Sequence, residues 1–371
     1  MFIYFENEKS FNSLSYETYF IILFGVFAFS LGSELALFAF PNHGKHNIRR
    51  IEQKNILVGL IFWLPIIGLP FFVANAYFLA ANGPSDILLI NLRRSLTGED
   101  GSPDKFGWWV YLISIANFSI GLNFINQVNW RRQIISISAA ITYDIFATGR
   151  TFLVFTMVFI LALQLILKRP NFKRNILLWS IPFIVSFFIL GATLGKGGIL
   201  DQGLKENIDS IVPIFRTYVV GPVPAFDQYL RNKPEVDFGK NTFRFFLAVL
   251  SKIGIDIKVP QLMQPFVFVP DPVNVYTLYQ TYFMDYSFIG VYLIQFFLGF
   301  FHGFLYVKSK SGHPFYIFIF SIFLYPLFMQ FFEDQYVSLL STWLQYLLLA
   351  LIFFPLGRKI IYPQSFIGKY E

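Results

Sequence analysis

The sequence predicts an all-α, polytopic integral membrane protein. Hydrophobic residues make up 55% of the chain and charged residues only 14%, whereas charged residues make up about 25% of an ordinary soluble domain. Apolar runs also recur along the chain at a length close to the roughly 20 residues that a helix needs to cross a bilayer. We therefore expect a single membrane domain over residues 1–371.

Nine apolar runs are long enough to be predicted as transmembrane helices. They comprise residues 18–40, 56–80, 108–126, 133–149, 151–167, 176–195, 287–307, 315–332 and 337–356. The fourth and fifth runs are expected to meet in a tight turn at Gly149 and Arg150, because one helix over both would be too long for the bilayer. In the seventh run, Gly299 and Gly303 form a Gly-x-x-x-Gly pair, which is typical of closely packed membrane helices.

Lys and Arg residues in the short connections predict the orientation, because such loops stay on the cytoplasmic side. They gather in every second connection, at Lys45, Arg49, Arg50 and Lys54, at Arg131 and Arg132, at Lys168, Arg169, Lys173 and Arg174, at Lys308 and Lys310, and at Arg358 and Lys359. This alternation places the N-terminus outside and the C-terminus in the cytoplasm. It also places the connection 81–107 and the long loop 196–286 outside.

The residue inventory limits the chemistry. The chain has no cysteine, which excludes disulfides and thiolate metal sites. Of its four histidines, His43, His46 and His313 fall in cytoplasmic connections, and His302 lies towards the inner end of the seventh span. With no histidine on the outer face, we expect no metal and no cofactor there. The net charge of +7 reflects basic cytoplasmic loops, so we expect no nucleic-acid partner.

The long loop 196–286 is the only long break in the apolar sequence, and chemistry is expected there. It is too apolar to be a linker. Residues 208–219, 225–231 and 242–253 are predicted to form short helices that lie in the membrane interface.

Three sets of short strings carry a family resemblance, two of them in or next to this loop and one in the turn between the fourth and fifth runs. They are Asn274-Val275-Tyr276-Thr277, followed by Asp285 and Gly290; Thr148-Gly149-Arg150-Thr151; and Phe215-Arg216-Thr217-Tyr218, followed by Gly221 to Asp227. These strings resemble those of the oligosaccharide repeat unit polymerases, the Wzy-type O-antigen and capsule polysaccharide polymerases. The chain departs from that pattern at Tyr286 and Ser287, where the family prefers Phe-Gly, and it begins later than many such polymerases.

The resemblance implies a GT-C-like membrane glycosyltransferase that uses no metal ion and lies in the bacterial cytoplasmic membrane. Such an enzyme transfers a growing glycan from undecaprenyl pyrophosphate onto the next lipid-linked repeat unit at the outer face. The implied partners are the undecaprenyl-pyrophosphate-linked oligosaccharide, membrane lipid, a flippase and a chain-length regulator.

The expected site residues follow from the charges that such a transfer develops. Arg150 and Arg216 are predicted catalytic cations and Arg244 a substrate-binding one, because guanidinium binds phosphate oxygens bidentately and stays protonated. Asp227 and Asp285 are the predicted bases for the acceptor hydroxyl. The expected sugar contacts are Tyr218, Asn274, Tyr276 and Thr277.

Each of these residues also has a structural interpretation. Arg150 at a helix end is compatible with interfacial anchoring or with an ion pair to Asp144. Asp227 stands four residues before Arg231, which fits a helix-surface ion pair. Asp285 is suited to capping a helix, and Glu333 and Asp334 are reserve bases.

Two other functions remain open from the sequence. A lipid-linked oligosaccharide flippase or polysaccharide exporter needs ionisable residues along a path through the bilayer, whereas most ionisable residues of this chain lie at or beyond one face. An O-antigen ligase-type transferase shares nearly all the expected chemistry.

Overall fold

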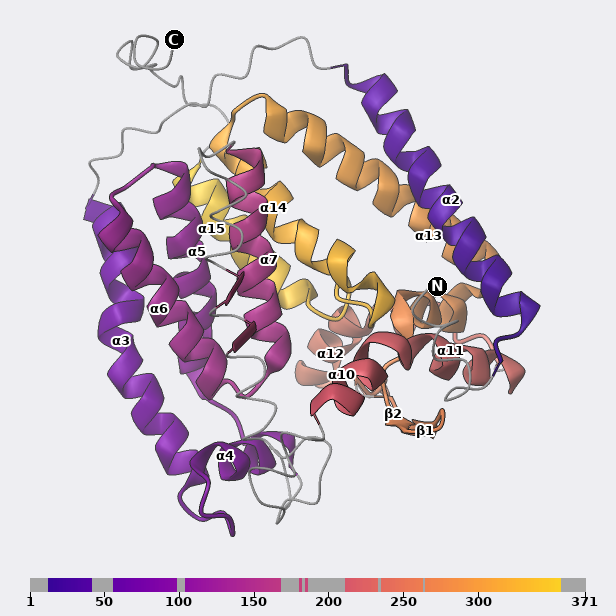
Figure 1. Cartoon of the computed structure of the whole chain (residues 1–371), viewed down its shortest axis with the longest axis horizontal. Helices are drawn as coiled ribbons and strands as arrows, with labels where there is room; N and C mark the ends of the chain where they lie inside the picture. Colours follow the sequence, from indigo (N-terminus) through magenta and orange to yellow (C-terminus); the bar gives the residue numbers. More distant parts are fainter. Residues whose placement is uncertain are drawn as a thin grey trace. The chain divides into compact units, whose positions relative to one another are not determined.

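The structure is a computed structural model that describes residues 13–41, 56–98, 104–167, 180–181, 184–185, 211–232, 235–262 and 264–354. The predicted span 176–195 lies outside the described residues except at four positions, and so do most of the basic connections. The described elements are helical apart from one two-stranded antiparallel hairpin, which confirms the all-α class (Figure 1).

The helices and strands have the following bounds. They are α2 (Tyr16–Ala39), α3 (Ile56–Ala80), α4 (Leu88–Thr97), η1 (Gly107–Val110), α5 (Tyr111–Ile125), α6 (Trp130–Phe146), α7 (Arg150–Ile166), α10 (Ile211–Val220), α11 (Pro222–Arg231), α12 (Arg244–Lys252), β1 (Val267–Phe268), β2 (Pro272–Val273), α13 (Thr277–Lys310), α14 (Pro314–Phe328), η2 (Met329–Phe331) and α15 (Leu340–Phe353). The three predicted interfacial helices correspond to α10, α11 and α12. Helix α4 and the hairpin had no counterpart in the prediction.

Five described helices are long and apolar enough to cross a membrane. They are α2, α3, η1 with α5, α13, and α14 with η2. Helices α7 and α15 are apolar but shorter. The chain therefore carries several candidate membrane spans, while the predicted total of nine stays a prediction.

The chain divides into two compact units. The first unit comprises Met1–His43, Val212–Lys308 and Tyr325–Leu344, and the second comprises Gly44–Ile211, Ser309–Leu324 and Gln345–Glu371. Each unit gathers parts that lie far apart in the sequence.

In the second unit, α3, α5, α6 and α7 pack around an aromatic core. The ring of Phe318 makes edge contacts with Phe118 and Phe159, with ring centroids 4.9 and 5.6 Å apart. A Cβ added at Gly121 would lie 2.7 Å from a ring atom of Phe318, so only glycine fits there. The Tyr143 hydroxyl donates to the Pro65 carbonyl at 2.7 Å and fastens α6 to α3.

In the first unit, α2 and α13 pack side by side with their backbones in contact (Figure 1). A Cβ added at Gly32 would overlap the Phe296 carbonyl, and one added at Gly299 would overlap the Phe29 carbonyl. A Cβ added at Gly303 would lie 2.7 Å from the Ser33 carbonyl oxygen, which is also closer than real Cβ contacts. This close approach confirms the expected role of the Gly299 and Gly303 pair.

Helix α13 is broken at Ser287, which has φ 56° and ψ −156°. The break separates residues 277–286 from the spanning segment that follows, so the predicted start of the seventh span at 287 coincides with it. A Cβ added at Gly290 would overlap the Tyr286 side chain, so the backbone just after the break also requires a glycine.

Candidate functional site

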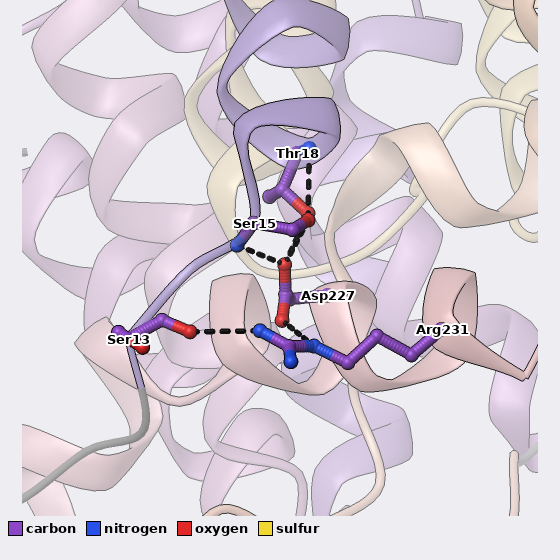
Figure 2. Close-up of polar contacts among 5 residues, drawn as sticks. All are labelled: Ser13, Ser15, Thr18, Asp227 and Arg231. Carbon is purple, nitrogen blue, oxygen red and sulfur yellow. Dashed lines mark hydrogen bonds and ion pairs between the residues drawn. The ribbon is translucent and has the colours of Figure 1, made fainter.

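Asp227, a predicted base, joins α11 to the start of α2 (Figure 2). Its Oδ1 accepts hydrogen bonds from the Ser15 amide at 2.7 Å, the Ser15 hydroxyl at 2.5 Å and the Thr18 hydroxyl at 2.7 Å. Its Oδ2 accepts from Arg231 Nε at 2.7 Å, and the same guanidinium donates to the Ser13 carbonyl at 2.9 Å. Both carboxylate oxygens are thus engaged by structural partners.

These contacts also set the proton affinity of Asp227. Burial by itself would raise the pKa of this carboxyl, but the hydrogen bonds from Ser15, Thr18 and Arg231 outweigh burial and lower the pKa. A carboxylate held ionised in this way is a weak proton acceptor. The geometry therefore favours the ion pair with Arg231, together with capping of α2, over the predicted role as a base.

Asp285, the other predicted base, is fully buried and organises the turn before α12. Its Oδ1 accepts from the Asn241 amide at 3.1 Å and side chain at 2.8 Å, and its Oδ2 accepts from the Thr242 amide and hydroxyl, each at 2.6 Å. The Asp237 amide donates to the Met284 carbonyl beside it at 2.8 Å. Asp285 therefore caps a turn of the long loop instead of its own helix, and these contacts too favour a structural role.

Two of the family-like strings meet at the segment just before α15. The Tyr218 ring stacks on the Phe332 ring with centroids 5.5 Å apart and planes 14° apart. The Thr277 amide donates to the Phe332 carbonyl at 2.9 Å, and Thr277 also pairs with Glu333 as a short parallel bridge. We call Tyr218, Thr277, Tyr282, Phe332, Glu333 and Asp334 the Phe332 site.

Thr277 has two features that mark functional positions. It has φ 62°, which is unusual for a β-branched residue. Its side chain is buried, and its hydroxyl has no hydrogen-bond partner within the part of the chain that the structure describes. A strained residue with an unsatisfied buried hydroxyl is a candidate for ligand contact.

Asp334 is the buried carboxyl group of the Phe332 site. It accepts hydrogen bonds from the Tyr282 hydroxyl at 3.2 Å and from the amides of Tyr336, Val337 and Ser338 at 3.0 to 3.2 Å. Burial raises the pKa of Asp334 to about 6, although these hydrogen bonds oppose the rise. A carboxyl group with a pKa in this range is suited to act as a general base near neutral pH.

A buried polar chain continues from this site, and the sequence analysis did not anticipate it. Tyr336 contacts His302 Nε2 at 2.8 Å through its hydroxyl, which also accepts from Gln330 at 3.3 Å. Gln330 in turn contacts Gln295 at 3.5 Å. This contact brings His302 of α13 to Tyr336 in the connection before α15, while the expected absence of histidine from the outer face stays a prediction. The available signal was the seven-residue spacing of Gln295 and His302, which puts both on one helix face.

The three predicted cations occupy different settings. Arg150 is the first residue of α7 and is buried in the second unit. The turn before it contains Thr148, which has φ 56°. Arg216 on α10 and Arg244 on α12 are half-buried in the first unit, and Arg244 Nε donates to the Pro260 carbonyl at 2.8 Å. The convergence of all three on a pyrophosphate stays a prediction.

The alternative ion pair of Arg150 with Asp144 has no support. The Thr156 hydroxyl donates to Asp144 Oδ2 at 2.7 Å and lies 2.9 Å from Asn117 Oδ1. Asp144 Oδ1 is buried, and it has no hydrogen-bond partner among the described residues. Asp144 is therefore part of a polar cluster inside the second unit.

Two predicted sugar contacts remain, Tyr276 and Asn274. The Tyr276 side chain is held by contacts within the fold. The Tyr276 hydroxyl donates to the Pro265 carbonyl at 2.7 Å, and its ring packs with Ala225, Val269 and Val273. Asn274 is half-buried between β2 and α13. Within the described ranges, no group of three or more His, Cys, Asp or Glu side chains is placed to hold a metal ion.

Comparisons with known protein families, with curated proteins and with solved structures found no match to this chain.

Proposed function

We propose that this protein is a membrane glycosyltransferase that polymerises lipid-linked oligosaccharide repeat units. It transfers a growing glycan from undecaprenyl pyrophosphate onto the next repeat unit, at the outer face of the bacterial cytoplasmic membrane. The observation that carries this proposal is the meeting of two family-like strings at the Phe332 site. Tyr218 and Thr277 lie 59 residues apart in the sequence, yet both contact Phe332.

The buried carboxyl group of this site supplies the base in the proposed reaction. The acceptor hydroxyl oxygen bonds to the anomeric carbon of the donor, and the bond from that carbon to the pyrophosphate oxygen breaks. Ionised Asp334 takes the hydroxyl proton, and the pyrophosphate leaves with the bonding electrons. Asp334 replaces Asp227 and Asp285 in this role because its pKa of about 6 suits proton transfer near neutral pH. All three carboxylates accept hydrogen bonds from the fold, so the choice depends on that pKa and on the place of Asp334 in the Phe332 site.

Arg216 is the proposed cation of the first unit for the leaving pyrophosphate. It is half-buried on α10, two residues before Tyr218. A guanidinium in a partly buried place stabilises developing phosphate charge more strongly than one in water. Thr277 Oγ1 is the proposed hydrogen-bonding group for a sugar hydroxyl, since it is buried without another partner among the described residues.

The test is complementation of a deletion strain, with surface glycan separated by length. Deletion should leave single repeat units on their acceptor in place of a ladder of chain lengths. Asp334→Asn should lower polymerisation by roughly the 10²-fold expected for loss of a general base, while Glu235→Gln, which changes an exposed carboxylate outside the Phe332 site, keeps the ladder. A normal ladder from Asp334→Asn at the usual protein level would remove Asp334 from the mechanism.

The same experiment separates the other functions. If the deletion strain holds lipid-linked repeat units only in the inner leaflet, the protein is a flippase or an exporter. If it makes polymer on the lipid carrier that never reaches the final acceptor, the protein is a ligase. Either result would overturn the polymerase proposal.

A further inference from the structure

Helix α12 presents an apolar stripe that no described part of the chain covers. Phe243, Phe246, Val249 and Ile253 are between 44% and 69% exposed. Their spacing of three, three and four residues puts them on one face. No residue of α12 itself is buried. Such a stripe on a short amphipathic helix is suited to a lipid surface.

Hydrogen bonds to Asp285 fix the position of α12, and of its stripe, along α13. The Asp285 carboxylate holds Asn241 and Thr242, which immediately precede the helix. Asp285 stands two residues before the break at Ser287, where the spanning segment of α13 begins. Helix α12 is thus fastened to the end of that segment within the first unit.

The spanning segment of α13 has its own exposed apolar face. Ile289, Leu293 and Phe297 follow each other at four-residue intervals, and each is more than half exposed. Because α13 is long and apolar enough to cross a membrane, such an exposed face is suited to contact with lipid. The stripe on α12 is thus attached at the end of a segment whose exposed face is also apolar.

The end of α12 adds positive charge beside the stripe. Gly254 has φ 96°, and its amide donates to the Ser251 carbonyl while the Ile255 amide donates to the Leu250 carbonyl, a Schellman cap that ends the helix sharply. Lys252 and Lys258 stand on either side of this cap and are exposed, with exposed Asp256 between them, so the segment keeps a net positive charge. Lysines at the rim of an apolar helix face attract anionic headgroups.

We propose that α12 lies in the interface of the membrane as an anchor that binds anionic lipid. The stripe of Phe243, Phe246, Val249 and Ile253 inserts among the acyl chains, and Lys252 and Lys258 contact headgroup phosphates. Asp285 holds this anchor at the end of the spanning segment of α13. The inference concerns lipid binding and does not depend on the glycan chemistry.

The absence of cysteine from the sequence makes single-cysteine spin labelling straightforward. Full-length Phe246→Cys and Ser251→Cys proteins are labelled and reconstituted in vesicles, and the collision rates of each label with oxygen and with a water-soluble nickel chelate are measured. Residue 246 lies on the stripe and exposed Ser251 on the opposite face. The label at 246 should favour oxygen and the label at 251 the nickel chelate.

Two outcomes would overturn the anchor. Equal nickel accessibility at 246 and 251 means that the stripe faces water, and shielding of 246 from both reagents means that protein, such as a second copy, covers it. Val249→Cys, on the same stripe, decides the case if Phe246→Cys does not fold.

The lysine contribution has its own control. Raising the fraction of phosphatidylglycerol in phosphatidylcholine vesicles should move the 246 label deeper. This response should disappear in K252Q/K258Q and persist in K105Q, which removes an exposed lysine between η1 and α4. If the label depth ignores phosphatidylglycerol, or K105Q loses the response equally, the anionic-lipid part of the proposal is wrong.

Discussion

Replacing Ser287 by glycine should stabilise the protein. Ser287 has φ 56° and ψ −156°, a combination that glycine adopts freely and a residue with a Cβ does not. A residue held in such a sparsely populated region costs about 1–3 kcal/mol. Glycine would remove this strain and lose about 0.5–1 kcal/mol through the greater freedom of the unfolded chain. The net gain should be about 1 kcal/mol.

The assay is thermal unfolding in detergent, followed by the loss of monodisperse protein. A gain of about 1 kcal/mol corresponds to a rise of the melting temperature of roughly 2 °C for a chain of this size. Ser30→Gly is the matched control, because Ser30 lies inside α2 and its hydroxyl donates to the Val26 carbonyl at 2.9 Å as in an ordinary helix. This control should lower the melting temperature, since glycine is a poor helix former.

The opposite substitution sharpens the test. Ser287→Val places a β-branched side chain in the same conformation and should destabilise the protein by about 1–2 kcal/mol. If Ser287→Gly lowers the melting temperature as Ser30→Gly does, then Ser287 does not hold the positive φ, and the account of the α13 break fails.

Three further predictions concern packing, pH and activity. Gly299→Ala should lower the melting temperature far more than Gly59→Ala, because its new methyl overlaps the Phe29 carbonyl while the Gly59 surroundings are open; equal effects would contradict close α2–α13 packing. The pKa of Asp227 is lower in the folded than in the unfolded state, so its stabilisation is present above about pH 4 and fades as the pH falls through the folded pKa. The melting temperatures of wild type and Asp227→Asn should therefore converge in acid, and a constant difference would exclude this linkage. Polymerisation should rise with pH through about 6 as Asp334 ionises, and a flat profile with the Asp334→Asn ladder intact would exclude it as the base.

Much of the fold could be predicted because it depends on local composition. Runs such as 18–40 and 56–80 are apolar throughout, and α2 and α3 follow them within a few residues. Helices α10 to α12 could also be placed, since their apolar periodicity and Pro222 mark them. The break at Ser287 could not be predicted, because serine has no intrinsic preference for a positive φ.

The candidate site was harder to predict, because its decisive contacts link residues far apart in the chain. Arg231 stands one helical turn from Asp227, and spacing alone indicated that pair. The donors that saturate Asp227 come from Ser15, 212 residues earlier, and the sequence carries no sign of them. The sequence indicated Asp334 only as a reserve base, because its burial and the hydrogen bond from Tyr282 depend on tertiary structure.

The bond between Ser15 and Asp227 has a consequence for assembly during translation. Helix α2 leaves the ribosome well before α11, and the carboxylate that binds its cap follows 212 residues later, which at about 5–20 residues per second is a delay of roughly 10 to 40 s. Its glycine-lined partner face on α13 is made later still. Until then Gly25 and Gly32 of α2 lack Tyr279 and Phe296, the α13 residues that they face in the folded protein, so α2 docks only after α13 has been made.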